Sequence, residues 1–259
     1  MGWGWYEPGR HDSGDGPFVI CLSGEEVSLF DADFPEETMT DLTREFCAEN
    51  VELVPAAIAA GARRIELCDN LAKGGTSPSL GVIRGAVRCC AGRGVDVMAM
   101  VRPRGGNFAY TDDELLMMED DIDCAFYAGA TGVVFGCARG GELDRDATLR
   151  LITRVREAEK RRGVPAQITF HMAFDEIAPQ RQLEAIDWLA EQGVTRILTH
   201  GGVAGTRIED NVACLREFVA RADGRITILP GAGITWENAE AIAGTVGVSE
   251  VHGTRIVRL

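Results

Sequence analysis

The sequence has no long hydrophobic run, no excess of positive charge and no dense group of cysteines. Its longest uninterrupted apolar stretches, such as residues 18–22, fall well short of the roughly 20 residues that a membrane-spanning helix needs. No basic segment followed by an apolar stretch and a cleavage site resembles a signal peptide. We therefore expect a cytoplasmic protein that has no membrane partner.

The shortage of basic residues excludes another class of partner. The chain of 259 residues has 26 Lys and Arg against 40 Asp and Glu, which gives a formal net charge of −14. Such a charge repels phosphodiester backbones and makes nucleic-acid binding a poor default. Any site for an anion must therefore be local.

The eight cysteines are scattered along the chain. They lack the density of a disulfide scaffold and the short spacing of a zinc knuckle. We expect most of them to be reduced, buried, small apolar residues. Cys47 and Cys68 are treated separately below.

A unit of short apolar strand, polar loop and amphipathic helix recurs from residue 44 onward. The expected strands are 44–49, 64–68, 95–101, 132–136, 166–171, 195–199, 225–229 and 248–252. The expected helices are 51–60, 79–91, 112–127, 144–161, 179–192, 208–221 and 236–245. This alternation predicts a parallel (β/α)8 TIM barrel over 44–259, with a doubly wound open sheet as the alternative.

Both ends of the predicted barrel are unusual. Residues 1–43 are rich in Gly, Asp, Pro and Glu with weak periodicity, which indicates an atypical, partly disordered extension. Only residues 253–259 follow the eighth strand, too few for a full eighth helix. Either the barrel is uncovered there or the extension packs across the gap.

Strand parity predicts an unusually polar barrel interior. Side chains alternate across a strand, so apolar partners on the helix side turn polar neighbours inward. The inward-facing set predicted in this way contains Glu45, Glu66, Glu250, Arg102, His171 and His252. Burying a charge without a partner costs several kcal/mol, so these groups must pair with one another or with a ligand. Their position at the carboxyl ends of strands, where barrel enzymes keep their sites, favours a site over a purely structural network.

Two cysteines face the same interior from adjacent strands. Cys47 and Cys68 should approach each other across neighbouring parallel strands. Two thiolates with the Met100 thioether nearby favour Cu(I) over harder metals, and His171 is a further candidate ligand. A compact four-ligand zinc pattern is absent.

The segment Arg102-Pro103-Arg104-Gly105-Gly106 follows the third strand and is suited to holding an anion. We expect Arg102 to pair with interior glutamates or a ligand and Arg104 to lean over the rim. The ends of strands six and seven add backbone N–H groups for a phosphate or carboxylate. The candidates there are Thr199, Gly201, Gly231 and Gly233, although turn formation explains such glycines equally well.

Several ordered motifs resemble those of the CutC copper homeostasis family. They include Glu45-Phe46-Cys47, Arg64-Ile65-Glu66-Leu67-Cys68, Gly74-Gly75-Thr76-Ser77-Pro78-Ser79, the Arg102–Gly106 segment, Val133-Val134-Phe135-Gly136, Thr169-Phe170-His171-Met172-Ala173-Phe174-Asp175, Arg196-Ile197-Leu198-Thr199 and His252-Gly253. The resemblance implies a (β/α)8 barrel, a cytoplasmic homo-oligomer such as a dimer or tetramer, and Cu(I) on Cys47 and Cys68. Met172, His200 and Ala232 depart from the family pattern, which usually has Arg, Ser and Gly there.

Three functions follow from these observations. The leading one is a Cu(I)-binding protein of copper homeostasis, with Cys47 and Cys68 as ligands. The rival is an enzyme acting on a small anionic metabolite, in which Arg102 and Arg104 clamp the anion. In that enzyme the acid and base candidates are Glu45, Glu66 and His171, with Asp175 orienting the imidazole. The third is a barrel kept for an interaction surface.

Overall fold

A computed structural model describes residues 42–203 and 205–259. The predicted extension, residues 1–43, therefore lies outside the described residues except for Leu42 and Thr43. Thr43 is already the first residue of the first strand, and Leu42 before it is buried. The first strand therefore begins one residue before the expected strand 44–49.

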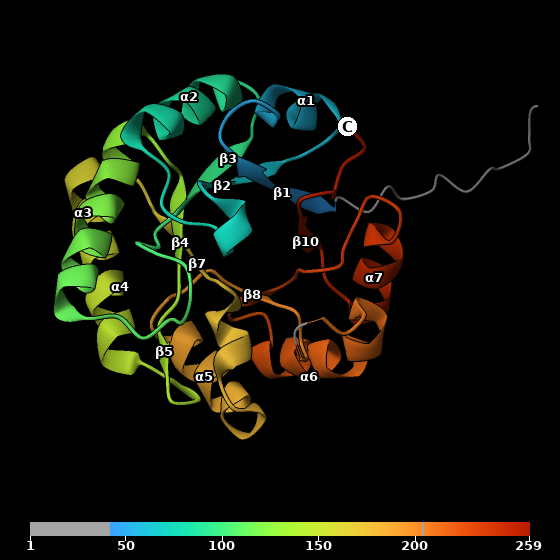
Figure 1. Cartoon of the computed structure of the whole chain (residues 1–259). Coiled ribbons are helices and arrows are strands. Elements are labelled where there is room, and N and C mark those ends of the chain that lie inside the picture. The colour runs from blue at the N-terminus through green and yellow to red at the C-terminus, as the bar shows by residue number, and fades with distance from the viewer. Residues whose placement is uncertain (1–41, 204) are drawn as a thin grey trace, which may run out of the picture. The chain divides into compact units, whose positions relative to one another are not determined.

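Eight parallel strands form the sheet, in the order β10-β1-β2-β3-β4-β7-β8-β9, and β9 and β10 lie beside each other. The strands surround a central axis in Figure 1, as predicted for a TIM barrel. Their bounds are β1 Thr43–Glu49, β2 Arg64–Cys68, β3 Asp96–Met100, β4 Gly132–Phe135, β7 Gln167–Phe170, β8 Arg196–Thr199, β9 Thr227–Pro230 and β10 Glu250–Gly253. A small hairpin, β5 Ala138–Arg139 with β6 Glu142–Leu143, lies outside the barrel sheet and was not predicted.

Helices ring the strands (Figure 1). Their bounds are α1 Val54–Ala59, α2 Leu80–Cys90, α3 Asp112–Ala128, α4 Arg145–Arg162, α5 Pro179–Glu191, α6 Val212–Ala222 and α7 Ala239–Val246. Short 3₁₀ turns occur at η1 Leu71–Lys73, η2 Met172–Glu176 and η3 Ile208–Asn211. The predicted start of α3 is confirmed by a capping box between Thr111 and Glu114. Among the helices of the described segments, none combines the length and hydrophobicity of a membrane span.

The parity prediction holds for the strands that build the centre. Phe46 and Ile65 belong to the large apolar core between strands and helices. Cys47, Cys68 and Met100 instead belong to a second, smaller cluster with Met98 and Val134, which we call the inner cluster. The alternation of side chains therefore separates the core that holds the fold together from the groups available for chemistry.

The described chain has no helix after β10, as the sequence predicts. An extended segment takes its place: Ile256 and Val257 are buried in the apolar core, and the Trp236 N–H donates to the Arg255 carbonyl at 2.8 Å. This segment therefore covers part of the surface that an eighth helix would occupy. Whether the extension adds to it stays a prediction on residues outside those described.

Candidate functional site

A closed ion-pair network occupies the amino-terminal half of the barrel interior. The Arg64 guanidinium donates to the Glu45 carboxylate and, at 2.6 Å, to Glu250. Arg196 donates to the same Glu250 carboxylate at 2.9 Å. Two buried arginines thus face two carboxylates, so the charges of these four groups largely cancel. We call this set the floor of the barrel. The sequence analysis named Glu250 but missed Arg64 and Arg196, which parity also turns inward.

His252 links this floor to a second carboxylate. Its Nδ1 lies 2.8 Å from a Glu45 oxygen and its Nε2 lies 3.7 Å from a Glu66 oxygen. Burial opposes ionisation of Glu45, but Arg64 and His252 outweigh it and lower the pKa of Glu45 to about 2. Burial also opposes protonation of His252, yet the Glu66 and Glu45 carboxylates hold its pKa well above the usual range. Burial raises the pKa of Glu66, against the attraction of His252.

The two predicted cysteines meet beside Glu66. Cys47 and Cys68 are buried, and their sulfurs lie within 4.8 Å of each other and of a Glu66 oxygen. Hydrogen bonding to Cys68, burial and the Glu66 charge raise the pKa of Cys47 well above its usual range. The hydrogen bond from Cys47 favours the Cys68 thiolate, but burial and Glu66 outweigh it and raise the pKa of Cys68 to about 11. Both groups are therefore neutral thiols at pH 7.

The sulfur atoms form a group of soft donors, and the Glu66 carboxylate is a hard donor beside them. Two thiols and the Met100 thioether share the inner cluster, which is the donor chemistry that Cu(I) prefers. One Glu66 oxygen is buried without a hydrogen-bond partner and so is free to take up a ligand or a proton. A second group with ligand spacing consists of Glu45, Glu66 and His252. His171 belongs to neither group.

Arg102 lies at the carboxyl end of the barrel, where its partners are backbone carbonyls rather than the interior glutamates that were one of its two expected kinds of partner. Its guanidinium donates to the carbonyls of Lys73, Gly74 and Gly75 and, at 2.8 Å, to that of Gly106. The side chain is 5% exposed and packs on the Phe108 ring. These carbonyls accept from Nη1 and Nη2, whereas the Nε atom is buried without a hydrogen-bond partner, and none of them cancels the charge. Arg102 therefore remains a buried cation.

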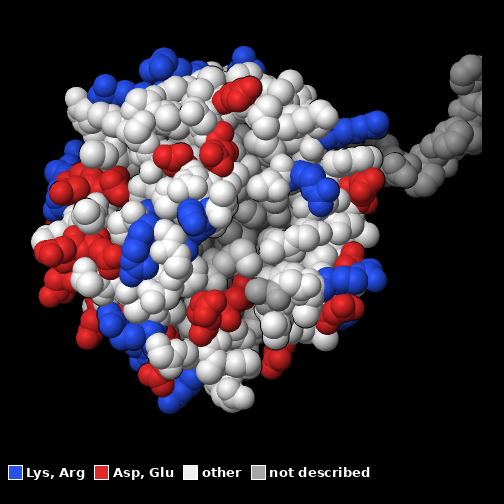
Figure 2. Space-filling model, viewed as in Figure 1, with Lys and Arg blue, Asp and Glu red and all other residues white. Residues whose placement is uncertain are grey.

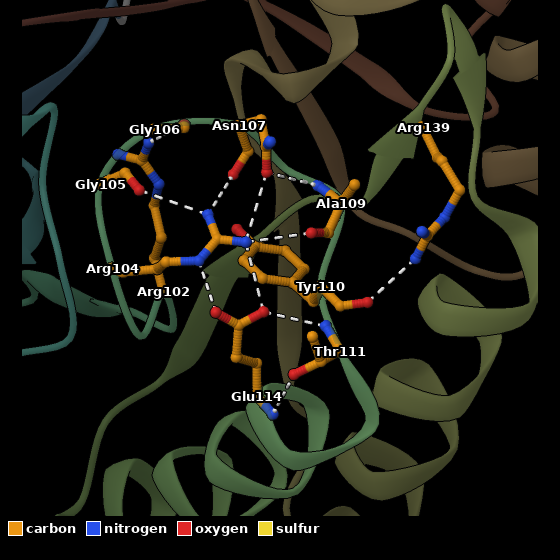
Figure 3. A network of polar contacts seen from close by, with 10 residues as sticks. All are labelled: Arg102, Arg104, Gly105, Gly106, Asn107, Ala109, Tyr110, Thr111, Glu114 and Arg139. Atoms are coloured by element: carbon orange, nitrogen blue, oxygen red, sulfur yellow. Dashed lines mark hydrogen bonds and ion pairs between the residues drawn. The ribbon is translucent and has the colours of Figure 1, made fainter.

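Arg104 lies at the rim, where its guanidinium makes two hydrogen bonds to Glu114 (Figure 3). It also donates to the carbonyls of Asn107 and Ala109, at 2.9 and 3.0 Å. The guanidinium therefore already has partners within its own loop and at the start of α3. On the face shown in Figure 2, acidic and basic side chains are interspersed around a central hollow.

His171 is a neutral donor at the end of β7. Its Nδ1 accepts the Ala173 N–H at 3.1 Å, which leaves the ring proton on Nε2. Burial and the nearby Arg102 charge lower the pKa of His171 to about 3. The Nε2 atom is buried and has no hydrogen-bond partner. Gly136 makes room for the ring, since a Cβ there would lie 2.6 Å from Nδ1.

Asp175 has partners other than the imidazole that it was predicted to orient. It accepts the Thr199 hydroxyl and, at 2.9 Å, the His200 N–H. Thr199 in turn accepts the Gly201 N–H at 2.9 Å. Burial raises the pKa of Asp175, partly offset by these hydrogen bonds. This group fixes the end of β8, and the Gly201 N–H is used within it.

The loop after β9 is also internally bonded. The Gly231 N–H donates to the Thr199 carbonyl at 3.0 Å, and the Gly233 carbonyl accepts from the Asn238 side chain at 3.1 Å. The His200 Nδ1 atom lies 3.0 Å from the Ala232 carbonyl. Ala232 has φ +59°, a left-handed conformation that glycine adopts more readily. Hydrogen bonds thus join Thr199 with Gly201 and Gly231, whereas Gly233 is bonded within its own loop.

The comparisons with known proteins agree with this architecture. The family model described as the CutC family matches residues 42–257. A CutC family protein of Enterococcus faecalis is 52% identical over 83% of this chain and 100% of its own length. The mouse copper homeostasis protein cutC homolog is 35% identical over 80% of this chain and 71% of its own length. A crystal structure of CutC from Streptococcus agalactiae has a TM-score of 0.77 and 41% identity, covering 83% of this chain and all of that one. The chain belongs to the CutC family.

Proposed function

We propose that this protein acts in copper homeostasis by binding Cu(I) through the buried thiols of Cys47 and Cys68. The observation that carries the proposal is the meeting of two thiols with the Met100 thioether inside the barrel. The mouse relative is described as a copper homeostasis protein. Soft sulfur ligands select Cu(I) over Mg²⁺, Ca²⁺ and Mn²⁺, which prefer oxygen.

The surroundings of the thiols support a site that exchanges protons for metal. A metal ion binds the thiolate, so uptake must release protons from the two high-pKa thiols. The Glu66 carboxylate lies beside them: one oxygen is 3.6 Å from the Cys68 sulfur, and the other has no hydrogen-bond partner. The positive charge of Cu(I) offsets part of the negative charge that two thiolates would add to this buried region. Met100 is the candidate third ligand.

The test is a Cu(I) titration of reduced, metal-free protein against a chromogenic chelator under anaerobic conditions. The expected result is about one tightly bound equivalent per chain, with the release of thiol protons. Replacing Cys47 and Cys68 together with serine should abolish this uptake. Cys137→Ser is the matched control, because Cys137 is buried in the large apolar core between strands and helices, here called the outer core, rather than in the inner cluster. Unchanged uptake in the double variant would refute the proposal.

We further propose a cytoplasmic location and assembly into a homo-oligomer, a dimer or tetramer. The seven cysteines of the described residues are all free, which is typical of a reducing compartment. Fractionation and sedimentation of the native protein test these two statements. A secreted protein or a monomer at physiological concentration would contradict them.

A second candidate function is an enzyme that acts on a small anionic metabolite. The specific support is the unpartnered His171 Nε2–H, a buried neutral donor near the uncancelled Arg102 cation. A thermal shift with inorganic phosphate and with oxalate tests it. A rise in melting temperature that is lost in His171→Asn supports an anion at this position, and no shift in the wild type counts against it.

A further inference from the structure

A short loop packs against the inner cluster at the end of β2. Residues 69–76, here called the strap, leave the strand directly after Cys68 and contain the 3₁₀ turn η1. The strap is closed at its base, where Asp69 and Thr76 exchange two backbone hydrogen bonds of 2.9 and 2.7 Å. Its two ends are therefore joined.

The returning arm of the strap, Gly74 and Gly75 just before its base, lies against Cys68 and Met100. A Cβ on Gly75 would lie 3.1 Å from the Cys68 sulfur and 3.7 Å from the Met100 methyl carbon. Gly74 and Gly75 both have positive φ, at +82° and +83°, which glycine adopts without strain. The backbone of the strap thus packs on the thiol site at a distance that a side chain would prevent.

Arg102, in the segment after β3, holds this returning arm. Its Nη1 atom donates to the carbonyls of Gly74 and Gly75, at 2.8 and 3.0 Å, and to that of Lys73 at 3.2 Å. The Arg102 N–H donates to the Ser77 hydroxyl at 2.8 Å, and the Arg102 carbonyl accepts from the Ser77 N–H at 2.9 Å. The planar guanidinium presents donors in a rigid fork, and the Nη2 atom holds Gly106 at the same time. A lysine would keep the charge but lose this geometry.

A second, weaker anchor holds the other side of the strap. The exposed Glu49 carboxylate accepts the Leu71 N–H at 2.9 Å. Leu71 itself packs against the inner cluster. The strap is therefore held by hydrogen bonds on both sides of the thiols, more of them on the Arg102 side.

We propose that Arg102 is a positioning residue that keeps the strap closed over Cys47 and Cys68, so that reagents and metal reach these thiols only when the strap is displaced. The part of this inference that concerns metal rests on the proposed function, whereas closure over the thiols does not. It assigns to Arg102 a role in access to the site in place of the anion clamp expected from the sequence. We call the hydrogen bonds from the Arg102 guanidinium to the carbonyls of Lys73, Gly74 and Gly75 the latch.

The experiment measures the alkylation rate of each cysteine in reduced, metal-free protein with N-ethylmaleimide at one pH, followed by peptide mass spectrometry. Arg102→Lys should speed the labelling of Cys68 by about tenfold, since it removes several hydrogen bonds that oppose local opening. Arg139→Lys is the matched control: Arg139 also donates to a loop carbonyl, that of Tyr110, but not to the strap. It should leave the Cys68 rate within about twofold of the wild type.

The labelling of Cys137 reports whether a variant has lost its fold, because this cysteine is buried in the outer core. Faster labelling of Cys68 with Cys137 still protected supports the latch. If Arg102→Lys also exposes Cys137, a variant of the exposed Glu49 anchor tests the latch instead. Glu49→Ala should accelerate Cys68 labelling without affecting Cys137. An unchanged Cys68 rate in a folded Arg102→Lys protein, or in Glu49→Ala where the first variant unfolds, overturns the inference.

A Cu(I) uptake measurement separates this inference from the proposed function. If both hold, Arg102→Lys takes up Cu(I) faster and reaches the same stoichiometry as the wild type. If the wild type binds no Cu(I), the proposed function fails while the labelling result still decides the latch. If Cu(I) binds but labelling is unchanged, only the latch fails.

Discussion

Two buried arginines in the same barrel have opposite kinds of partner. Arg64, on the floor, faces the carboxylates of Glu45 and Glu250. Arg102, at the mouth, faces backbone carbonyls of two loops. The floor is therefore an electrostatically closed structure, whereas the mouth keeps a positive charge and uses it to position loops. Arg102 also helps to lower the pKa of His171, an effect that a cancelled charge would not have.

The largest expected effect comes from breaking the floor. Arg64→Met leaves Glu45 and Glu250 without their shared cation, which should lower the free energy of unfolding by about 3–5 kcal/mol. Urea unfolding followed by circular dichroism measures this loss. Arg145→Met removes an ion pair to Glu184 in which both side chains are about half exposed, and should cost less than about 1 kcal/mol. Equal losses in the two variants would contradict the view of the floor as a closed network.

A pH titration of stability sharpens the contrast at the mouth. The folded protein holds the pKa of His171 at about 3, whereas the unfolded chain takes up that proton near pH 6.5. The contribution of His171 to the free energy of unfolding is therefore fully present above pH 6.5. It falls as the pH falls, by about 2 kcal/mol at pH 5. The window of Glu45, between 4.5 and about 2, lies below this pH.

His171→Asn removes the titrating group and should abolish this part of the pH dependence. The measurement is the difference in unfolding free energy between pH 7 and pH 5, for the variant and for the wild type. The wild type should lose about 2 kcal/mol more than the variant over this interval. An identical loss in both proteins would show that His171 is not held neutral.

The smallest expected effect concerns backbone strain at the mouth. Ala232 has φ +59°, so Ala232→Gly should relieve strain that exceeds the extra entropy of glycine in the unfolded chain. We expect a net stabilisation of about 0.5 kcal/mol in urea unfolding. Ala56→Gly, at an exposed position within α1, should instead destabilise by about 1 kcal/mol. A loss of stability in Ala232→Gly would contradict the assignment of strain.

Much of the site was predictable because it depends on strand parity. Alternation along β1 and β2 placed Cys47, Cys68 and Glu66 in one interior, and the structure brings their ligand atoms together. The same alternation applies to Arg64 and Arg196, which the sequence analysis overlooked although they are the first residues of β2 and β8. Attention to every inward position, rather than to the carboxyl ends alone, would have found them.

The partners of the mouth residues could not be predicted in this way. Arg102 was expected to face interior glutamates or a ligand, and in the structure it binds carbonyls that belong to a loop 27 to 29 residues earlier. Asp175 was expected beside His171, but it accepts hydrogen bonds from Thr199 and His200. Parity assigns the face of a strand residue, whereas neither Arg102 nor Asp175 lies within a strand.

The sequence by itself determined the repeated strand and helix, the family motifs and the side of each strand on which a residue lies. The strands, the helices and the side on which a residue lies follow from local periodicity, and the motifs follow from residue identity along the chain. Only the tertiary structure decided which buried charge is cancelled and which remains, and that the strap packs against Cys68 and the inner cluster. The reason is physical: a hydrogen bond depends on distances and angles between loops far apart in the chain, and these exist only once the barrel has closed.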